Sequence, residues 1–403
     1  MKASRALLAA LALTVLAGAI TPAAAIPAFA RKYRVSCSLC HSAAPKLTAF
    51  GENFAANGFE IAPGEVPVDT IATPDPLLRL QRDLPLAVRF DAFAQLLTGM
   101  PGDATSVDLQ TPWGIKLLSG GQIADRISYY MYFFLTERGE VSGLEDAYVQ
   151  FTDLARTGVN LMVGQFQISD PLFKRELRLS VEDYQPYRIR VGEAAADLTY
   201  DRGFMATWSP LEGTDIALLL VNGFGLRAAD ESRTYDNDNW KNVAARISQD
   251  VGPLRIGAFG YLANEERDDI IDEIRIYGPD ATLALGRFGE LNAQFLRRTD
   301  DDPFFLGPLI SAETTVDAAL AELVLWPQGE NGRLFLTGIF NWIDADAPLV
   351  TLRAGELSPL ERYRYGAGNL SWLVQRNLRL MGEAGRDFEA DVWRFTLGFT
   401  AAF

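Results

Sequence analysis

The chain has 403 residues, enough for one large domain or two smaller ones, and its formal net charge is −15. This acidic balance argues against nucleic acid as a partner, because surfaces that bind phosphate are basic. With two cysteines and one histidine in the whole chain, a zinc site built from Cys and His alone would lack a fourth ligand, and a hydrolytic triad is excluded once the single histidine is assigned elsewhere.

Residues 1–25 have the features of a secretory signal peptide. Lys2 and Arg5 precede an apolar run over 7–20, and the Ala23-Ala24-Ala25 stretch offers a cleavage site before Ile26. A retained membrane anchor is the alternative, but the apolar run is short for a spanning helix. Cleavage would bring the net charge to about −17 by formal counting, and no other long apolar run follows.

The sequence Cys37-Ser38-Leu39-Cys40-His41 holds both cysteines and the only histidine. Cys-x-x-Cys-His is the attachment pattern of c-type haem, in which the histidine becomes an axial iron ligand. A thioredoxin-like redox pair would need a βαβ context, which is absent, and a zinc site would need further ligands. The motif therefore predicts one covalently bound haem c on Cys37 and Cys40, with His41 as proximal ligand.

Residues 26–80 are predicted to form a small monohaem cytochrome c domain. Ser36 can cap a short helix that carries the motif, and Leu47, Phe50 and Phe54 share one face of a following helix that stops near Gly58. We expect these apolar side chains to pack on the haem, because about fifty residues rarely make a core alone. A linker rich in Pro and Asp, from Pro63 to Pro76, follows.

From residue 81 to 403 the sequence alternates apolar and polar residues in segments of ten to fourteen residues. This period is typical of transmembrane β-strands with one face toward lipid and one toward the lumen. In the last segment Trp393, Phe395, Leu397 and Phe399 share a face, and the chain ends on Phe403. A soluble β-sandwich or propeller is the alternative, disfavoured by the density of large apolar residues on outward faces.

About sixteen strands are predicted, and the fold class is a mainly β outer-membrane barrel with a small α-helical N-terminal domain. The predicted strands are 84–97, 111–123, 124–138, 143–153, 158–167, 197–209, 213–223, 239–250, 252–264, 272–286, 288–299, 312–326, 332–343, 360–374, 376–387 and 390–403. Tight turns, the first near Gly120-Gly121, alternate with longer connections, as periplasmic turns alternate with external loops in such barrels. An even count places both ends of the barrel on the periplasmic side, where haem attachment would occur.

The longest external connection, about 168–196, is the third in the series and is rich in Arg, Lys and acidic residues. By analogy with porins, in which the third loop often folds inward, it is expected to narrow the pore. A mobile surface loop is the alternative.

The order of signal, haem unit and barrel resembles the fused outer-membrane cytochrome–porins, which include monohaem cytochromes that oxidise Fe(II). The resemblance is carried by local matches that together cover about thirty residues: Phe29-Ala30-Arg31, Ser36-Cys37-Ser38-Leu39-Cys40-His41, Pro45-x-Leu47-Thr48-x-Phe50-Gly51 and Phe54-x-x-x-Gly58-Phe59. The barrel matches only in length, pattern and C-terminal Phe.

That resemblance implies an electron conduit in the bacterial outer membrane, with the haem domain on the periplasmic side or within the lumen. Extracellular Fe(II) would be the donor and a periplasmic cytochrome or other carrier the acceptor, so an Fe(II) oxidase activity is the implied chemistry. Two alternatives stay open. The chain could be a porin with a haem-containing plug, or it could export electrons to an external acceptor.

The sixth iron ligand is open from sequence. The parity of the strands places Met162, Met205 and Met381 on the lumen side, whereas Met131 faces lipid. Within the haem unit the candidates are Lys32 and Lys46, for which an ordinary solvated surface position is the alternative. A site that is open or bound to water is equally allowed. Methionine ligation would raise the haem potential, which suits an acceptor of electrons from iron.

Acidic clusters in predicted external loops could capture Fe(II), because carboxylates are hard oxygen ligands. Simple solvation, or bridging of lipopolysaccharide by divalent cations, is the alternative. The clusters are Asp236-x-Asp238, Glu265-Glu266 with Asp268-Asp269, and Asp300-Asp301-Asp302.

Overall fold

The computed structural model describes residues 28–62, 70–71, 73–75, 77–78, 80–82, 85–100, 104–141, 143–307, 313–352 and 359–403. The predicted signal peptide, and most of the predicted linker from Pro63 to Pro76, lie outside these residues. No helix among the described residues is long and apolar enough to cross a membrane.

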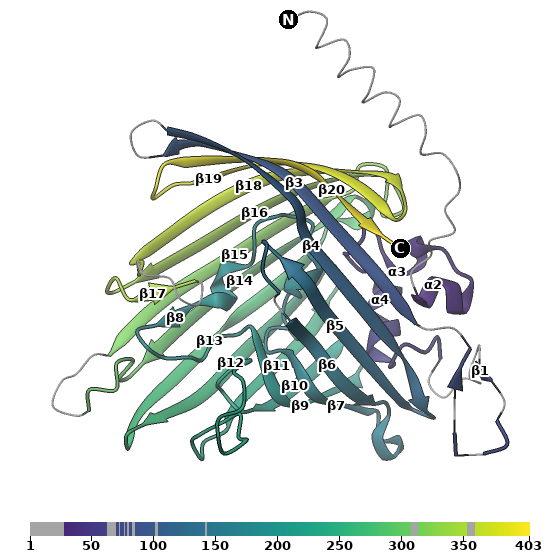
Figure 1. Ribbon diagram of the computed structural model, residues 1–403, viewed down its shortest axis with the longest axis horizontal. Helices are drawn as coiled ribbons and strands as arrows, with labels where there is room; N and C mark the ends of the chain where they lie inside the picture. The colour runs from purple at the N-terminus through teal and green to yellow at the C-terminus, as the bar shows by residue number, and fades with distance from the viewer. Residues whose placement is uncertain are drawn as a thin grey trace, which may run out of the picture.

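Sixteen antiparallel strands close into one barrel, as predicted (Figure 1). The strands are β3 (Leu86–Met100), β4 (Ala104–Ala124), β5 (Ile127–Glu137), β6 (Gly143–Phe151), β7 (Val159–Gln167), β9 (Tyr200–Leu211), β10 (Thr214–Val221), β11 (Asn242–Val251), β12 (Leu254–Arg267), β13 (Ile270–Ala284), β14 (Gly289–Asp300), β15 (Thr314–Leu325), β16 (Leu334–Ala345), β18 (Arg362–Gln375), β19 (Leu378–Asp387) and β20 (Val392–Ala402). The last strand pairs with the first, from Trp393 opposite Thr98 to Ala402 opposite Arg89. Closure removes both sheet edges, so every strand has two neighbours.

Short elements complete the fold. The helices are α2 (Ala28–Tyr33), α3 (Cys37–Cys40) and α4 (Ala49–Ala56), with single 3₁₀ turns η1 (Leu154–Arg156), η2 (Arg175–Leu177), η3 (Gln185–Arg188) and η4 (Gly286–Phe288). Two small strand pairs stand apart from the barrel: β1 (Thr70–Ile71) with β2 (Leu80–Gln81), and β8 (Arg190–Val191) with β17 (Val350–Thr351).

The barrel wall has an apolar outer face and a polar inner face. Along β10, Leu218 and Leu220 are exposed whereas Leu219 is buried inside. Along β20, Leu397 is 70% exposed, but Thr396 and Thr400 on the opposite face are 4% exposed. Apolar residues directed away from the protein on a closed barrel are the arrangement that lipid requires, so the fold indicates an outer-membrane location.

One predicted turn is wrong in detail. Gly120 and Gly121 lie inside β4, and the turn falls at Asp125 and Arg126. A Cβ on Gly120 would lie 2.9 Å from Cζ of Phe29 in the helical segment, so this glycine serves close packing and not chain reversal.

The connection between β12 and β13 was expected to be an external loop and is a two-residue turn. Asp268 and Asp269 have φ of +50° and +64°, the left-handed pair of a tight hairpin. Pairing continues to Arg267 opposite Ile270, so Glu265 and Glu266 are strand residues. Asp300 likewise ends β14. The external ends of these strands therefore extend beyond their predicted limits.

Candidate haem-attachment site and the barrel lumen

The Cys-x-x-Cys-His motif forms one helical turn, α3, followed by His41. Ser36 caps this turn by accepting a hydrogen bond from the Ser38 amide at 3.3 Å, as predicted. Cys37 and Cys40 are both half-buried free thiols. One turn of helix places the two thiols on the same side of the chain, which is what attachment to one porphyrin edge requires.

Helix α4 supports this turn from behind. A Cβ on Gly51 would collide with the carbonyl oxygen of Cys40, so only glycine allows the two backbones to approach this closely. Thr48 caps α4 through the Gly51 amide, and its hydroxyl donates to the Leu39 carbonyl at 2.7 Å. Helix α4 ends at Asn57, and Gly58 follows with φ +69°, which confirms the predicted stop.

His41 has the environment of a metal-ligating imidazole. Its Nδ1 lies 3.0 Å from the Pro45 carbonyl oxygen. A proton held on Nδ1 by this carbonyl leaves the lone pair of Nε2 for iron, the usual arrangement of ligating histidines. Burial lowers the pKa of His41, and hydrogen bonds with the Pro45 and Lys46 backbones raise it by less. The neutral imidazole, which is the form that binds a metal, is therefore favoured at pH 7. The motif residues therefore fit a haem.

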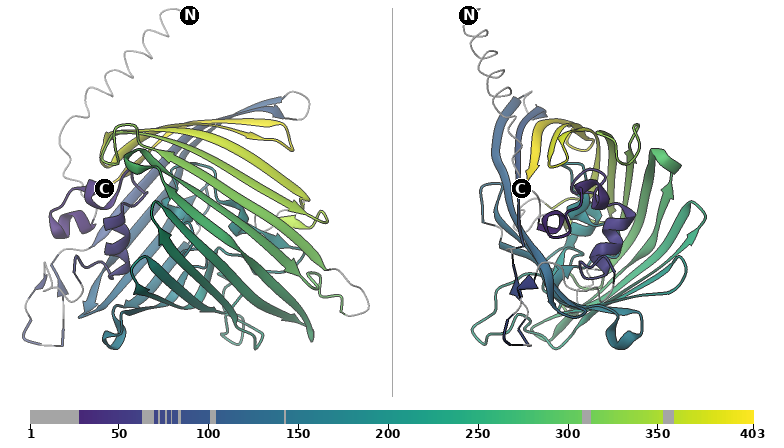
Figure 2. Two further views of the ribbon diagram at one scale, coloured as in Figure 1. Left: turned by 180° about the vertical axis from the view of Figure 1, so that it is seen from behind. Right: turned by 90° about the vertical axis from the view of Figure 1, so that its right-hand side faces the viewer.

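The helical segment, residues 28–62, occupies the barrel mouth that carries the short turns (Figure 2). Phe59 stacks on Tyr130 of the wall with ring centroids 5.4 Å apart. The Ala56 carbonyl accepts hydrogen bonds from Gln150 at 2.6 Å and from Asn160 at 3.1 Å. Sequence left open whether this unit enters the lumen or lies below it, and the structure places it inside the mouth.

One ion pair joins this segment to the far wall. Lys46 Nζ lies 2.5 Å from a carboxylate oxygen of Glu290 on β14, and both side chains are mostly buried. Burial alone would lower the pKa of Lys46, but the Glu290 and Glu322 carboxylates raise it above its ordinary value. The ammonium group is therefore held charged as an anchor.

We expect Lys46→Met to loosen the helical segment. Removing one partner leaves Glu290 unpaired at a partly buried position, which costs roughly 1–2 kcal/mol, between the values for exposed and buried pairs. Tryptic cleavage after Arg31 should then be about tenfold faster in the purified barrel. The double variant Lys46→Met/Glu290→Gln leaves no unpaired charge and should recover most of the protection. Equal cleavage of the single and double variants would show that the ion pair is not the anchor.

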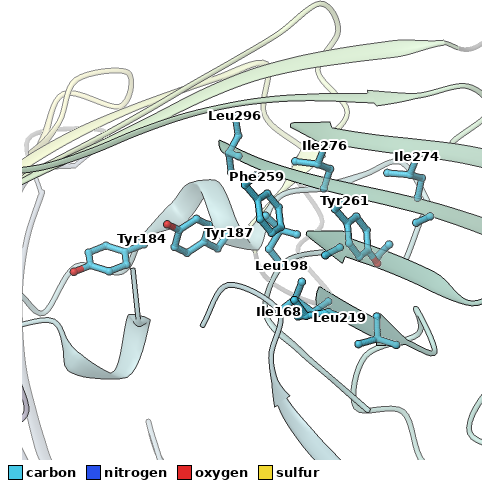
Figure 3. Packing of buried hydrophobic residues seen from close by; sticks show 14 of the residues in the cluster. Ile168, Tyr184, Tyr187, Leu198, Leu219, Phe259, Tyr261, Ile274, Ile276 and Leu296 are labelled. Carbon is cyan, nitrogen blue, oxygen red and sulfur yellow. The ribbon is translucent and has the colours of Figure 1, made fainter. Parts of the chain in front are cut away.

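The long third connection, residues 168–199 and here called the lumen loop, folds into the barrel. Ile168, Tyr187 and Leu198 are buried against wall residues such as Phe259 and Tyr261 (Figure 3). The inward loop expected by analogy is thus confirmed. The strand pair of β8 with β17, which no sequence pattern indicated, ties the loop to the β16–β18 connection.

Asp183 is the electrostatic centre of the lumen loop. Arg175 donates to it through Nε at 3.1 Å and Nη2 at 2.5 Å. Arg188 donates at 3.0 Å, and Arg178 lies at 3.5 Å. Burial alone would raise the pKa of Asp183, but Arg175, Arg178 and Arg188 hold it well below its ordinary value. The loop is therefore tied to itself by one buried carboxylate.

The lumen loop and the helical segment meet inside the barrel. Leu179 of the loop and Ala43 of the segment belong to one buried cluster with Trp326, Phe335 and Leu373 of the wall. Ala43 is two residues beyond His41. The loop that enters from the long-loop end thus reaches the immediate neighbourhood of the candidate haem site. The sequence carried no signal for this contact.

The candidate sixth ligands lie at separate places. Met162 and Met205 are register partners on β7 and β9 and pack with the lumen-loop cluster. Met381 is 3% exposed and packs with Phe93 and Trp113. All three side chains face the lumen, as predicted. Met131 is 46% exposed on the outer face, also as predicted.

The acidic clusters are largely engaged in ion pairs. Asp236 pairs with Lys241 at 2.5 Å, Asp300 with Arg298 at 2.6 Å and Asp301 with Arg275 at 3.3 Å. Within the described part of the chain, no group of three or more His, Cys, Asp or Glu side chains is arranged to hold a metal ion.

No protein-family model and no curated protein matches this sequence. Solved porins share its fold. An anion-selective porin from Comamonas acidovorans superposes with a TM-score of 0.58 at 10% identity, over 80% of this chain and 99% of that one. OmpF of Salmonella typhi, solved in complex with daunomycin, superposes with a TM-score of 0.53 at 9% identity, over 83% of this chain and 100% of that one. A loop L8 deletion mutant of OmpT of Vibrio cholerae superposes with a TM-score of 0.52 at 8% identity, over 80% of this chain and 99% of that one. These likenesses show that residues from β3 to β20 adopt a porin-type barrel.

Proposed function

We propose that this chain is an outer-membrane electron conduit: a porin-type barrel whose mouth holds one haem c on Cys37 and Cys40, with His41 as axial ligand. The observation that carries the proposal is the position of the Cys-x-x-Cys-His turn. It sits in the short-turn mouth, and Ala43 beside it shares a buried cluster with Leu179 of the loop that enters the lumen from the other end. Short turns face the periplasm in outer-membrane barrels.

The residues around the motif supply what such a haem needs. The Pro45 carbonyl orients His41, and Gly51 and Thr48 hold the attachment turn rigid. The rings of Phe29, Phe54 and Phe59 form an apolar cluster in the same segment, with Phe29 and Phe59 stacked at 4.8 Å. When bound, the haem supplies a one-electron carrier.

We propose Fe(II) outside the cell as donor and a periplasmic cytochrome as acceptor. Each Fe(II) that becomes Fe(III) gives up one electron, which passes inward and reduces one oxidised acceptor. The ferric product is insoluble, so its formation outside the cell is an advantage. In this proposal Met162, Met205, Met381 and Lys46 remain the candidates for the sixth ligand, and the ion pair of Lys46 with Glu290 disfavours the last.

Anaerobic visible spectroscopy of the purified, oxidised protein mixed with Fe(II) tests the proposal. We expect a reduced c-type spectrum to appear rapidly. Haem that stays oxidised with Fe(II) but is reduced by dithionite would overturn Fe(II) as donor and favour outward electron transfer. The absence of any c-type spectrum from protein matured in a cytochrome-competent host would overturn the haem itself.

A second candidate function is a diffusion porin with a helical plug. It is favoured by the similarity of the fold to solved porins and by a small charged cavity in the lumen. A cavity of about 30 Å³ in the lumen is lined by Arg89, Lys116, Arg178 and Arg379 together with Glu176. Basic linings attract anions. Single-channel conductance in planar bilayers separates the two functions, since a conduit filled by the loop and the helical segment should conduct ions poorly.

A further inference from the structure

The charges of this acidic protein are segregated along its chain. Residues 28–51 contain Arg31, Lys32, Arg34 and Lys46 and no Asp or Glu, although the whole chain carries −15. Lys46 is neutralised inside the barrel by Glu290. The remaining positive charges lie on α2 and on the turn that follows it, at the short-turn mouth (Figure 2).

Two barrel turns add to this charge. Arg333 donates to the Leu373 carbonyl at 2.9 Å, and Arg376 donates to the Asn331 carbonyl at 2.6 Å. Arg31 likewise donates to the Leu86 carbonyl at 2.8 Å. Bonds to backbone carbonyls orient a guanidinium group without cancelling its charge. We call Arg31, Arg34, Arg333 and Arg376 the basic rim.

The basic rim is not compensated by carboxylates. Among the residues that the structure describes, none of its four arginines forms an ion pair. Arg31, Arg34 and Arg333 are exposed, and Arg376 is partly exposed. Glu330, in the turn that precedes Arg333, is also exposed and is the acidic exception within these turns. The four arginines of the basic rim therefore present positive charge at a mouth whose other short turns carry the exposed acidic residues Asp125, Glu212 and Asp250.

The rim lies beside the attachment turn. Ala43 shares a buried cluster with Trp326 and Leu373, which precede the turns that carry Arg333 and Arg376. The Arg376 charge is close enough to act on the Cys37 thiol. Leu39, between the two cysteines, is 38% exposed and offers an apolar contact beside the basic rim. A small apolar centre within a charged margin is the usual anatomy of a transient protein interface.

Arg34 follows α2 in a left-handed conformation, with φ +53°, and the Val35 amide donates to the Ala30 carbonyl at 3.2 Å. This arrangement ends the helix at the mouth. Other arginines of the chain, such as Arg126 and Arg233, share this backbone conformation, so Arg34 is distinguished by its charge and position alone.

We infer that the basic rim is a docking surface for an acidic periplasmic electron-transfer protein. This inference rests on the proposed function, because the partner must approach the attachment turn to exchange an electron with it. Complementary charge raises the association rate and orients the partner while leaving the complex short-lived. Headgroups of anionic lipid are a less fitting occupant, since the rim lies on one side of the mouth, beside the attachment turn, and not on the apolar outer wall.

The test compares Arg31→Glu/Arg34→Glu with Arg227→Glu/Arg233→Glu. The control pair makes the same charge change at two exposed arginines of the external β10–β11 connection, and Arg233 also has a left-handed backbone, with φ +65°. Arg333 and Arg376 are left intact because they hold turns. Binding of poly-L-glutamate to the full chain in detergent, measured by calorimetry at 20 and 200 mM salt, requires no redox activity.

We expect the rim variant to bind poly-L-glutamate at least about tenfold more weakly at low salt and the control variant to bind like the parent, because exposed charges act over about one Debye length. Oxidation of the reduced haem by ferricyanide, an anion, should slow in the rim variant, whereas oxidation by tris(phenanthroline)cobalt(III), a cation, should become faster. Equal effects in both variants, or unchanged binding in the rim variant, would overturn the docking surface.

The two proposals fail in different ways. A protein without a c-type spectrum would overturn the proposed function, whereas the poly-L-glutamate measurement would still decide whether the rim binds acidic chains. Loss in the rim variant of binding to phosphatidylglycerol nanodiscs, with unchanged poly-L-glutamate binding, would identify lipid as the occupant and overturn the protein partner.

Discussion

Replacing Cys40 or His41 with alanine is expected to abolish the normal c-type spectrum while the barrel still assembles. In the proposed function, Cys40→Ala removes one of the two thiols that would attach the haem, and His41→Ala removes the proposed axial ligand, whose ring Pro45 orients. Neither side chain contributes to strand pairing, since closure depends on the register of β20 with β3. The loss of spectrum should therefore be complete and the loss of folded barrel small.

The measurement combines the pyridine haemochrome spectrum with heat-modifiability of the barrel on a gel. Met131→Leu is a suitable control, because Met131 is exposed on the outer face far from any proposed ligand role. Retention of a normal c-type spectrum by both Cys40→Ala and His41→Ala would contradict the haem assignment. Failure of the barrel itself to fold would instead assign a structural role to the turn.

Asp183→Asn is expected to release the lumen loop. The change leaves Arg175, Arg178 and Arg188 without their shared carboxylate in a buried place, and breaking a buried ion pair costs about 3–5 kcal/mol. Trypsin should then cut within the loop of the folded barrel, and ion conductance should rise. The loop is anchored also by β8 with β17, so the barrel itself should persist.

Asp250→Asn is the matched control for this variant. Asp250 is an exposed carboxylate on β11 that pairs with Arg255 across the short turn to β12. Exposed ion pairs contribute about 0–1 kcal/mol to stability. Conductance and tryptic protection of the control should match the parent. Protection of the Asp183→Asn loop at the parental level would contradict the role assigned to the Asp183 cluster.

The same cluster predicts how the lumen loop responds to pH. Because its three arginines hold the pKa of Asp183 well below the ordinary value of 3.8, the carboxylate stabilises the loop fully above that value. Its contribution declines only as pH falls from 3.8 through the lower folded pKa. Tryptic fragments or conductance measured after incubation at stepwise lower pH should therefore stay unchanged at pH 5. Loop release already near pH 5 would contradict this assignment.

Much of the fold followed from local pattern. Residues that alternate between lipid and lumen have a period of two, which is visible in any ten consecutive residues, so all sixteen strands could be predicted. The errors occurred where pattern and turn residues disagree. Gly120 and Gly121 look like a turn but lie within β4, because Phe29 from the helical segment packs against Gly120.

The haem assignment rests on five consecutive residues and stays a prediction. The helix limits at Ser36 and Gly58 could be predicted and are confirmed, because they depend on local hydrogen bonding. The surroundings of the motif could not be predicted. Lys46 and Glu290 are 244 positions apart, and nothing in either sequence neighbourhood identifies the other as its partner.

By itself, then, the sequence determined the strand number, the outward apolar face and the helical turn of the Cys-x-x-Cys-His motif, since each depends on the order of neighbouring residues. Only the tertiary structure decided that the helical segment enters the mouth, that Leu179 reaches Ala43, and that Arg31 and Arg376 belong to one rim. The physical reason is that the lumen is filled by segments from opposite ends of the barrel. Their contacts depend on shape and charge brought together by closure, and such contacts leave no periodic trace in the chain.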